Sequence, residues 1–283
     1  MMKTRVFTMM CLLAMCAFAS RAEIIKGNGQ IITKAVNVSD YHEIEISGNI
    51  SCNTVSKSFM GLVKNITNNG NCPKFYYSQK SGEHKVTVTI DSNLFPYLKI
   101  TTDRGKLTFT TKGHDNLNAT RLEVNACSSS FDGLKNTGCF DFYTLTGIDG
   151  GGLSIECNGS GDVYLDHLLR LNRLSLNVTG SSDVKTVNAA CNFIYITVTG
   201  SGDVDITGKA DEGTYNVSGS GDIKAYNCII KKLTCGVSGS GDIHCHATQK
   251  LSASVSGSGD LKYMGNPETS NHVTGSGDIA HVK

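Results

Sequence analysis

The sequence predicts an all-β protein built as a single-stranded parallel β-helix, a solenoid with coils of about 18–21 residues. Two observations predict it: a phrase of the form Val-Ser-Gly-Ser-Gly-Asp-Ile occurs seven times from residue 157 onwards, and apolar and polar residues alternate around each copy. The aspartates of the seven copies are Asp162, Asp183, Asp203, Asp222, Asp242, Asp260 and Asp278, in steps of 18 to 21 residues. A repeat of this length corresponds to one solenoid coil, since a single unit cannot bury its own apolar face.

Residues at odd distances from each aspartate form the apolar set. Five residues before the aspartates stand Cys157, Val178, Val198, Val217, Val237, Val255 and Val273. Alternation of this kind is the period of a β-strand and does not fit helical spacing. The two glycines of each phrase fall on the apolar positions, where they permit a corner or a close approach of backbones. A right-handed solenoid is expected, because parallel crossovers are overwhelmingly right-handed.

The first residues read as a secretory signal peptide, predicted over residues 1–22. A basic start leads into an apolar run over 6–19, which is too short to span a bilayer, and small residues precede the expected first mature residue, Glu23. A lipoprotein signal ending at Cys16 is the alternative, although Met15 fits it poorly. The sequence therefore predicts export to the periplasm, the outer-membrane surface or the extracellular space.

The front half, residues 23–150, is β-rich but carries no clear copy of the phrase. Alternating strands are predicted over 41–46, 85–90, 97–102 and 106–111. Degenerate (worn) copies of the phrase are suggested at Ser47–Ile50 and Cys127–Gly133. A long loop or insertion is predicted at 52–80, and a join to the regular coils at Asp149–Gly152. We expect irregular coils that cap the regular solenoid of residues 151–283, since terminal repeats are atypical. A separate small domain is the alternative.

Cysteine usage leaves the pairing open. The chain has eleven cysteines, two of which lie within residues 1–22, so an odd number remains after cleavage. Cys157, Cys235 and Cys245 fall on apolar positions and are predicted to be small core residues. Cys52–Cys72 and Cys127–Cys139 are plausible disulfides in an exported protein.

The serial Gly-Ser-Gly-Asp-Ile phrases resemble the putative auto-transporter adhesin head GIN domain family of exported Bacteroidetes proteins. Residues 41–48 and 261–267 also match, and the resemblance covers roughly residues 40–281. It implies a parallel β-helix similar in shape to pectin-lyase-like folds without their catalytic residues, and an adhesive role. Ser182 and Asn158 depart from the repeated pattern.

The row of aspartates is the first candidate site. Stacked coils place these carboxylates about 4.8 Å apart, and like charges at that distance repel. Calcium could neutralise such a row. We favour the alternative that each carboxylate accepts hydrogen bonds from serine hydroxyls and turn amides, because three lysines, Lys185, Lys224 and Lys262, flank the row. The candidate binding residues are the seven aspartates together with Ser220, Ser240 and Ser258.

Other chemistries are less well supported. His244 and His246 lie beside Asp242 on one strand face, but no third histidine completes a zinc site, so solvated histidines are favoured. The formal net charge of +1 includes no concentrated basic stretch, so nucleic acid is not expected as a partner. Two observations disfavour a glycan-cleaving enzyme. Tryptophan, the usual residue for stacking against sugars, is absent, and the aspartates form one regular row, whereas a hydrolase needs a pair of carboxylates across a cleft.

The sequence thus favours an exported, non-enzymatic module that binds a glycan or a matrix or cell-surface protein, without a cofactor. A structural envelope protein that has no specific ligand and a degenerate polysaccharide-active enzyme are the alternatives. The β-helix itself does not decide among them, because one fold hosts many functions.

Overall fold

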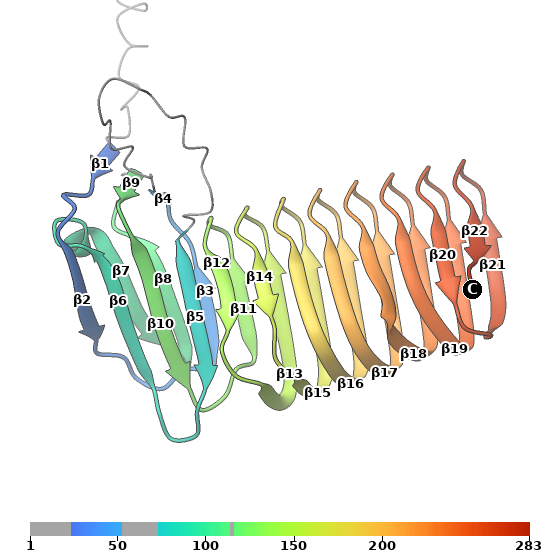
Figure 1. Ribbon diagram of the computed structural model, residues 1–283, viewed down its shortest axis with the longest axis horizontal. Coiled ribbons are helices and arrows are strands. Elements are labelled where there is room, and N and C mark those ends of the chain that lie inside the picture. Colours follow the sequence, from blue (N-terminus) through green and yellow to red (C-terminus); the bar gives the residue numbers. More distant parts are fainter. Residues whose placement is uncertain (1–23, 53–72, 114–115) are drawn as a thin grey trace, which may run out of the picture.

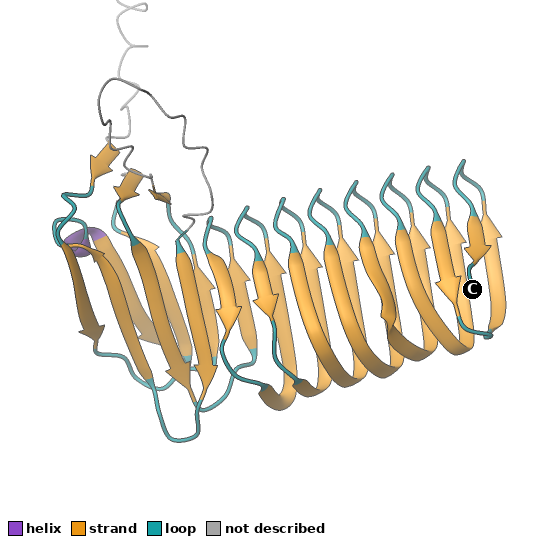
Figure 2. Cartoon of the chain, in the orientation of Figure 1, coloured by secondary structure: helices purple, strands orange, loops and turns teal. Residues whose placement is uncertain are grey.

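The computed structural model describes residues 24–52, 73–113 and 116–283. The predicted signal peptide therefore lies outside the described residues. The molecule is a long solenoid in which two sheets face each other, joined by sharp turns along one edge and by curved strands along the other (Figures 1 and 2). The predicted all-β parallel solenoid is confirmed. Among the described residues, no helix has the length and apolar character needed to cross a membrane.

The strands of the front half are short, and one 3₁₀ turn (η1, Phe95–Tyr97) interrupts them. They are β1 (Ile24–Lys26), β2 (Ile31–Val36), β3 (Glu43–Ile46), β4 (Ile50–Cys52), β5 (Lys74–Gln79), β6 (Lys85–Asp91), β7 (Leu98–Asp103), β8 (Lys106–Thr111), β9 (Asn116–Ala119), β10 (Leu122–Ser128), β11 (Gly133–Asn136) and β12 (Asp141–Thr144).

In the regular coils, strands β16–β19 are long and curve from one sheet into the other, and shorter strands lie at the two ends of the run. They are β13 (Ile148–Cys157), β14 (Val163–Leu165), β15 (Leu169–Val178), β16 (Val184–Val198), β17 (Val204–Val217), β18 (Ile223–Val237), β19 (Ile243–Val255), β20 (Leu261–Met264), β21 (Glu268–Val273) and β22 (Ile279–His281).

Each Gly-Ser-Gly-Asp phrase forms the sharp turn of one coil, which we call a tip (for example Thr199–Asp203). The tips stack into one edge of the molecule, the tip edge (Figure 1). Segments that enter the tips form the pre-tip sheet, in the order β8, β3, β11, β13, β15, then the second halves of β16–β19, then β21. Segments that leave the tips form the post-tip sheet, in the order β10, β5, β12, β14, then the first halves of β16–β19, then β20 and β22.

The N-terminal end departs from the expected run of irregular coils. There β7 pairs antiparallel with β8 on the pre-tip sheet, and β2, β6 and β10 pair antiparallel at the end of the post-tip sheet. The predicted strands at 41–46, 85–90, 97–102 and 106–111 exist with small shifts as β3, β6, β7 and β8. Their pairing direction was not foreseen, because an alternating pattern specifies the buried face of a strand and not its partner.

One of the two predicted worn copies is a tip and the other is not. Ser47 and Gly48 lie beneath the tip of the next coil, where the Thr137 amide donates to the Ile46 carbonyl over 2.9 Å. Residues 127–133 instead contain the end of β10 and the connection to β11. The tip of that coil is Asn136–Phe142, in which Asp141 occupies the aspartate position and Phe140 replaces the second glycine.

Two expected irregular stretches contain regular structure. Within the predicted loop over 52–80, residues 53–72 lie outside the described residues, but Lys74–Gln79 forms strand β5 between β10 and β12. The predicted join at Asp149–Gly152 lies inside the continuous strand β13.

The core fills the space between the two sheets. In the regular coils it consists of aliphatic rows, and in the front half it is aromatic, with Phe75 stacked on Phe142 at 5.5 Å between ring centroids. The prediction for Cys157, Cys235 and Cys245 is confirmed, because all three are buried in this core. In the last coil the corresponding rows end in polar, exposed residues such as Thr269 and Asn271, which keeps the open end of the core from presenting a large apolar surface.

The expected Cys127–Cys139 disulfide is wrong. The thiol of Cys127 is free and lies near the end of β10, 3.9 Å from Glu83 Oε2. Cys139 lies in the tip after β11, with its Sγ 2.7 Å from the Ile50 carbonyl oxygen. The four residues of β11 separate the two cysteines along the strand direction by about 13 Å, too far for a bridge. Cys72 of the other expected pair lies outside the described residues.

The tip glycines are required because successive tips approach closely. A Cβ placed on Gly239 would lie 2.1 Å from the carbonyl oxygen of Gly219 in the preceding coil, and one on Gly241 would lie 2.0 Å from that of Gly221. Neither glycine has a positive φ. The restriction is therefore contact between stacked backbones, and a side chain on either residue would push two coils apart.

We predict that Gly239→Ala destabilises the fold by about 1–3 kcal/mol, the usual cost of overpacking, because the added Cβ meets backbone atoms of the preceding coil, which cannot yield locally. The control is Gly151→Ala in β13, where an added Cβ meets nothing within 4 Å. Urea unfolding followed by circular dichroism measures both. Equal midpoints for the two variants would contradict the stacking account.

Asp91, fully buried at the end of β6, links separate segments of the front half by hydrogen bonds. Its Oδ1 accepts the Gly29 amide over 2.7 Å and its Oδ2 accepts the Thr120 amide over 2.8 Å. Burial alone would raise the pKa of Asp91, but the hydrogen bonds from Thr120 and Gly29 outweigh it and hold the pKa below its ordinary value. The ionised carboxylate thus links three separate turns.

A carboxyl with a depressed folded-state pKa stabilises the fold above its unfolded pKa of about 3.9, and this contribution is lost as pH falls through the folded value. We predict that Asp91→Asn costs about 1–3 kcal/mol at pH 7, because an amide group then faces an N–H donor. The variant should also lose less stability than wild type between about pH 4 and pH 2. Asp103→Asn, at a carboxylate that is 86% exposed, is the control and should follow wild type.

Candidate functional site

The tip edge presents two rows of polar residues to solvent, and all of them except Asn158 bear a hydroxyl. The first row contains the central serine of each tip: Ser160, Ser181, Ser201, Ser220, Ser240, Ser258 and Ser276. The second contains the residue before the first glycine: Thr137, Asn158, Thr179, Thr199, Ser218, Ser238, Ser256 and Thr274. All of these residues are exposed. The side chains of Ser220, Ser240 and Ser258 make no hydrogen bond to any other described residue, so their hydroxyls are available to a ligand.

Behind the serines the aspartates form a continuous ladder of hydrogen bonds. The Oδ1 of each aspartate accepts the backbone N–H of the aspartate one coil later, at 2.7–3.1 Å. The ladder runs from Asp141 through Asp162, Asp183, Asp203, Asp222, Asp242 and Asp260 to Asp278. Turn amides were expected as donors, whereas the expected serine hydroxyls do not contribute. Sequence reasoning missed Asp141, which its distance of 21 residues from Asp162 could have revealed.

The second carboxylate oxygen, Oδ2, is not part of the ladder and has varied partners. Asp203 Oδ2 pairs with the Lys224 ammonium at 2.5 Å, and Asp260 Oδ2 pairs with Lys262 at 3.5 Å. Burial alone would raise the pKa of Asp203, but Lys224 and the Asp222 amide hold it below its ordinary value. Burial, together with the nearby charge of Asp162, raises the pKa of Asp141 at the start of the ladder. Lysines therefore relieve part of the repulsion along the row.

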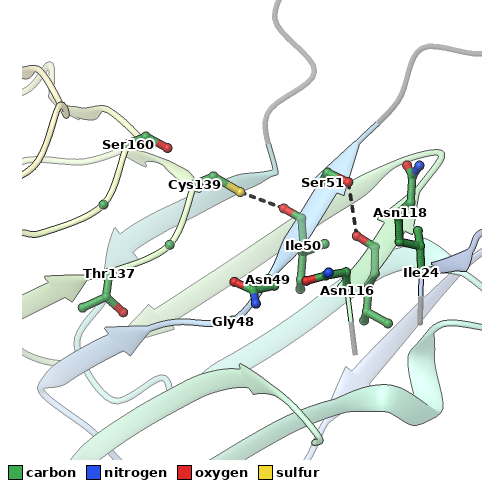
Figure 3. A pocket seen from close by; sticks show the side chains of 13 residues that line it. Ile24, Gly48, Asn49, Ile50, Ser51, Asn116, Asn118, Thr137, Cys139 and Ser160 are labelled. Carbon is green, nitrogen blue, oxygen red and sulfur yellow. Dashed lines mark hydrogen bonds between the residues drawn. The ribbon is translucent and has the colours of Figure 1, made fainter. Parts of the chain in front are cut away.

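At its N-terminal end the tip edge meets a small parallel sheet of β1, β9 and β4, and an open pocket of about 670 Å³ lies between them (Figure 3). Its polar lining consists of neutral amides and hydroxyls, among them Asn49, Asn116, Asn118 and Ser160. Figure 3 shows Cys139 pointing at the Ile50 carbonyl and Ser51 at that of Leu117. None of the described residues that line the pocket is charged, so this lining suits a polar, uncharged chemical group.

The histidines near Asp242 do not form a ligand cluster. The His244 ring stacks on Tyr226 at 4.9 Å between centroids, and His246 Nδ1 lies 3.2 Å from the Tyr226 carbonyl oxygen. No group of three or more His, Cys, Asp or Glu side chains in the described part of the chain is arranged to hold a metal ion.

Comparison with known proteins supplies the family. The family model described as "Putative auto-transporter adhesin, head GIN domain" matches residues 66–267, which is most of the chain. The protein belongs to this family. The family is named for adhesins, and its structural neighbours are named as putative adhesins or as a putative lipid binding protein. No curated protein matches the chain.

Three of the solved structures similar to this GIN-domain protein come from Parabacteroides. A putative lipid binding protein of Parabacteroides distasonis is 29% identical, with a TM-score of 0.81, and the match covers 92% of this chain and 100% of that one. A putative adhesin of Parabacteroides merdae is 25% identical, with a TM-score of 0.80 and coverage of 93% and 100%. A putative adhesin of Parabacteroides distasonis is 29% identical, with a TM-score of 0.80 and coverage of 92% and 100%.

The ladder predicts a difference between two substitutions of one aspartate. Asp222→Ala removes the acceptor of the Asp242 amide and should cost about 1–2 kcal/mol, whereas Asp222→Asn keeps a carbonyl oxygen there and should cost less than half of that. Asp211→Ala, which breaks an exposed ion pair with Lys231, is the control and should cost below about 1 kcal/mol. Urea unfolding provides the measurement, and an alanine variant as stable as wild type would refute the structural role of the ladder.

Proposed function

We propose that this protein is an exported adhesion module that binds a surface glycan or a matrix or cell-surface protein along its tip edge. The observation that carries the proposal is the row of exposed serine hydroxyls without partners among the described residues. These hydroxyls are spaced by the coil repeat, about 4.8 Å, on a backbone that cannot shift locally. A ligand therefore meets donors and acceptors that are already in place, which reduces the entropy lost on binding.

The aspartates have a divided role in this proposal. One oxygen of each carboxylate maintains the ladder, and the other is available to a ligand in coils that lack a lysine partner, such as those of Asp222 and Asp242. Membership in a family named for adhesins supports the same function. Export rests on the predicted signal peptide over 1–22.

The proposal predicts that the double variant Ser220→Ala, Ser240→Ala weakens binding at least tenfold while the unfolding midpoint stays within error of wild type. Residues 23–283 are applied to an array of immobilised glycans, mucin, fibronectin and laminin, and the best binder is titrated. This loss of affinity is expected because each hydroxyl contributes about 0.5–1.5 kcal/mol to binding as a hydrogen-bond partner of the ligand.

The matched control is Ser81→Ala, Thr101→Ala, which removes two exposed hydroxyls away from the tips and should bind as wild type does. Absence of saturable binding across the whole array by the folded protein would refute the adhesion proposal. Equal losses in the tip variant and the control would place the binding surface elsewhere.

A further inference from the structure

A shallow groove of about 370 Å³ crosses the outer face of the pre-tip sheet, away from the tips. Its floor is a row of small hydroxyl side chains at matching positions of successive coils. The register pairs Thr214 with Thr234, Thr234 with Ser252, and Ser252 with Ser270. Small residues in consecutive strands leave the sheet surface low at this point, and the hydroxyls provide both donors and acceptors.

An aromatic ring closes one end of this groove. Tyr195 pairs with Thr214 and lines the groove. The guanidinium of Arg173, which belongs to the strand before that of Tyr195, lies 5.0 Å from the centre of the Tyr195 ring. Because Arg173 occupies the side towards the N-terminus and the groove opens on the side towards the C-terminus, one face of the ring borders the groove. A fixed aromatic face of this kind stacks against flat apolar surfaces such as the C–H face of a sugar ring.

The charged wall of the groove carries an unpaired cation. The Lys232 ammonium lies 3.5 Å from Glu212 Oε1 in the preceding coil. Lys250, one coil later, lies beside Glu268 of the next strand in the register but forms no ion pair with it or with any other described residue. A lone ammonium beside a row of hydroxyls attracts a carboxylate, and the hydroxyls can complete its hydrogen bonds.

We propose that this groove binds an acidic oligosaccharide, with one sugar ring on Tyr195, a carboxylate at Lys250 and sugar hydroxyls on the row from Thr214 to Ser270. Three strand steps of about 4.8 Å separate the level of Tyr195 from that of Lys250, a span of about 14 Å that suits a chain of a few sugars. The site is independent of the tip edge and extends the protein's binding surface to a second face.

Calorimetric titration of residues 23–283 with tetragalacturonate, and with the uncharged maltotetraose, tests the proposal. Wild type should bind the acidic probe at least tenfold more tightly, and this preference should shrink as salt is raised. Tyr195→Ala should weaken both probes at least tenfold through loss of stacking. Lys250→Gln should weaken only tetragalacturonate, bringing the ratio of the two dissociation constants close to one.

Matched controls are Lys231→Gln, whose ammonium pairs with Asp211 2.7 Å away, and Tyr97→Ala in the front half; both should bind as wild type does. Thermal unfolding confirms that each variant is folded. The proposal is overturned if wild type fails to bind tetragalacturonate at millimolar concentration, or if both groove variants bind it like wild type. The Ser220→Ala, Ser240→Ala variant should retain tetragalacturonate binding, which separates failure of this site from failure of the tip edge.

Discussion

Contact between the backbones of successive tips is the constraint on which the rest of the structure depends. The tips stack so closely that no Cβ fits on Gly239 or Gly241, and this forces glycine into both positions of nearly every phrase. Close stacking in turn brings each aspartate amide within hydrogen-bond distance of the preceding carboxylate. A sharp turn that would otherwise have unsatisfied amides therefore becomes a bonded ladder. The serine between the two glycines then has nowhere to point except outward.

The same constraint separates structural positions from binding positions within the seven-residue phrase. Glycines and aspartates hold the coils in register, while the serine and the residue before the first glycine expose their side chains and bond the preceding coil through their backbone amides. Sequence can vary at the exposed positions without affecting the ladder, as Asn158 does in the row otherwise occupied by Ser and Thr. On the outer face of the pre-tip sheet, single larger residues such as Tyr195 can be introduced without disturbing the core. A solenoid of this type can therefore carry several independent binding surfaces.

The sequence predicted the regular coils well because each coil repeats one local rule. The spacing of the aspartates, the buried aliphatic rows and the close approach at the glycines all followed from that repeat. It could not specify the antiparallel partners of β2 and β7, because strand alternation says nothing about direction. The tip at Asn136–Phe142 was missed because Cys139 and Phe140 stand where the other tips have Ser and Gly, so the repeated phrase is not recognisable there. The Tyr195 groove depends on residues from several coils and became visible only once their register was known.

Amide hydrogen exchange at the tips tests the central claim most directly. Exposed turns normally exchange within seconds to minutes, but the ladder requires the amides of Asp183, Asp203, Asp222, Asp242 and Asp260 to be bonded. Exchange measured by NMR on residues 23–283 should show these amides protected as strongly as those in the core strands β16–β19. Rapid exchange at the tips alongside protected strands would contradict the account, because the tips would then be loose turns appended to the sheets.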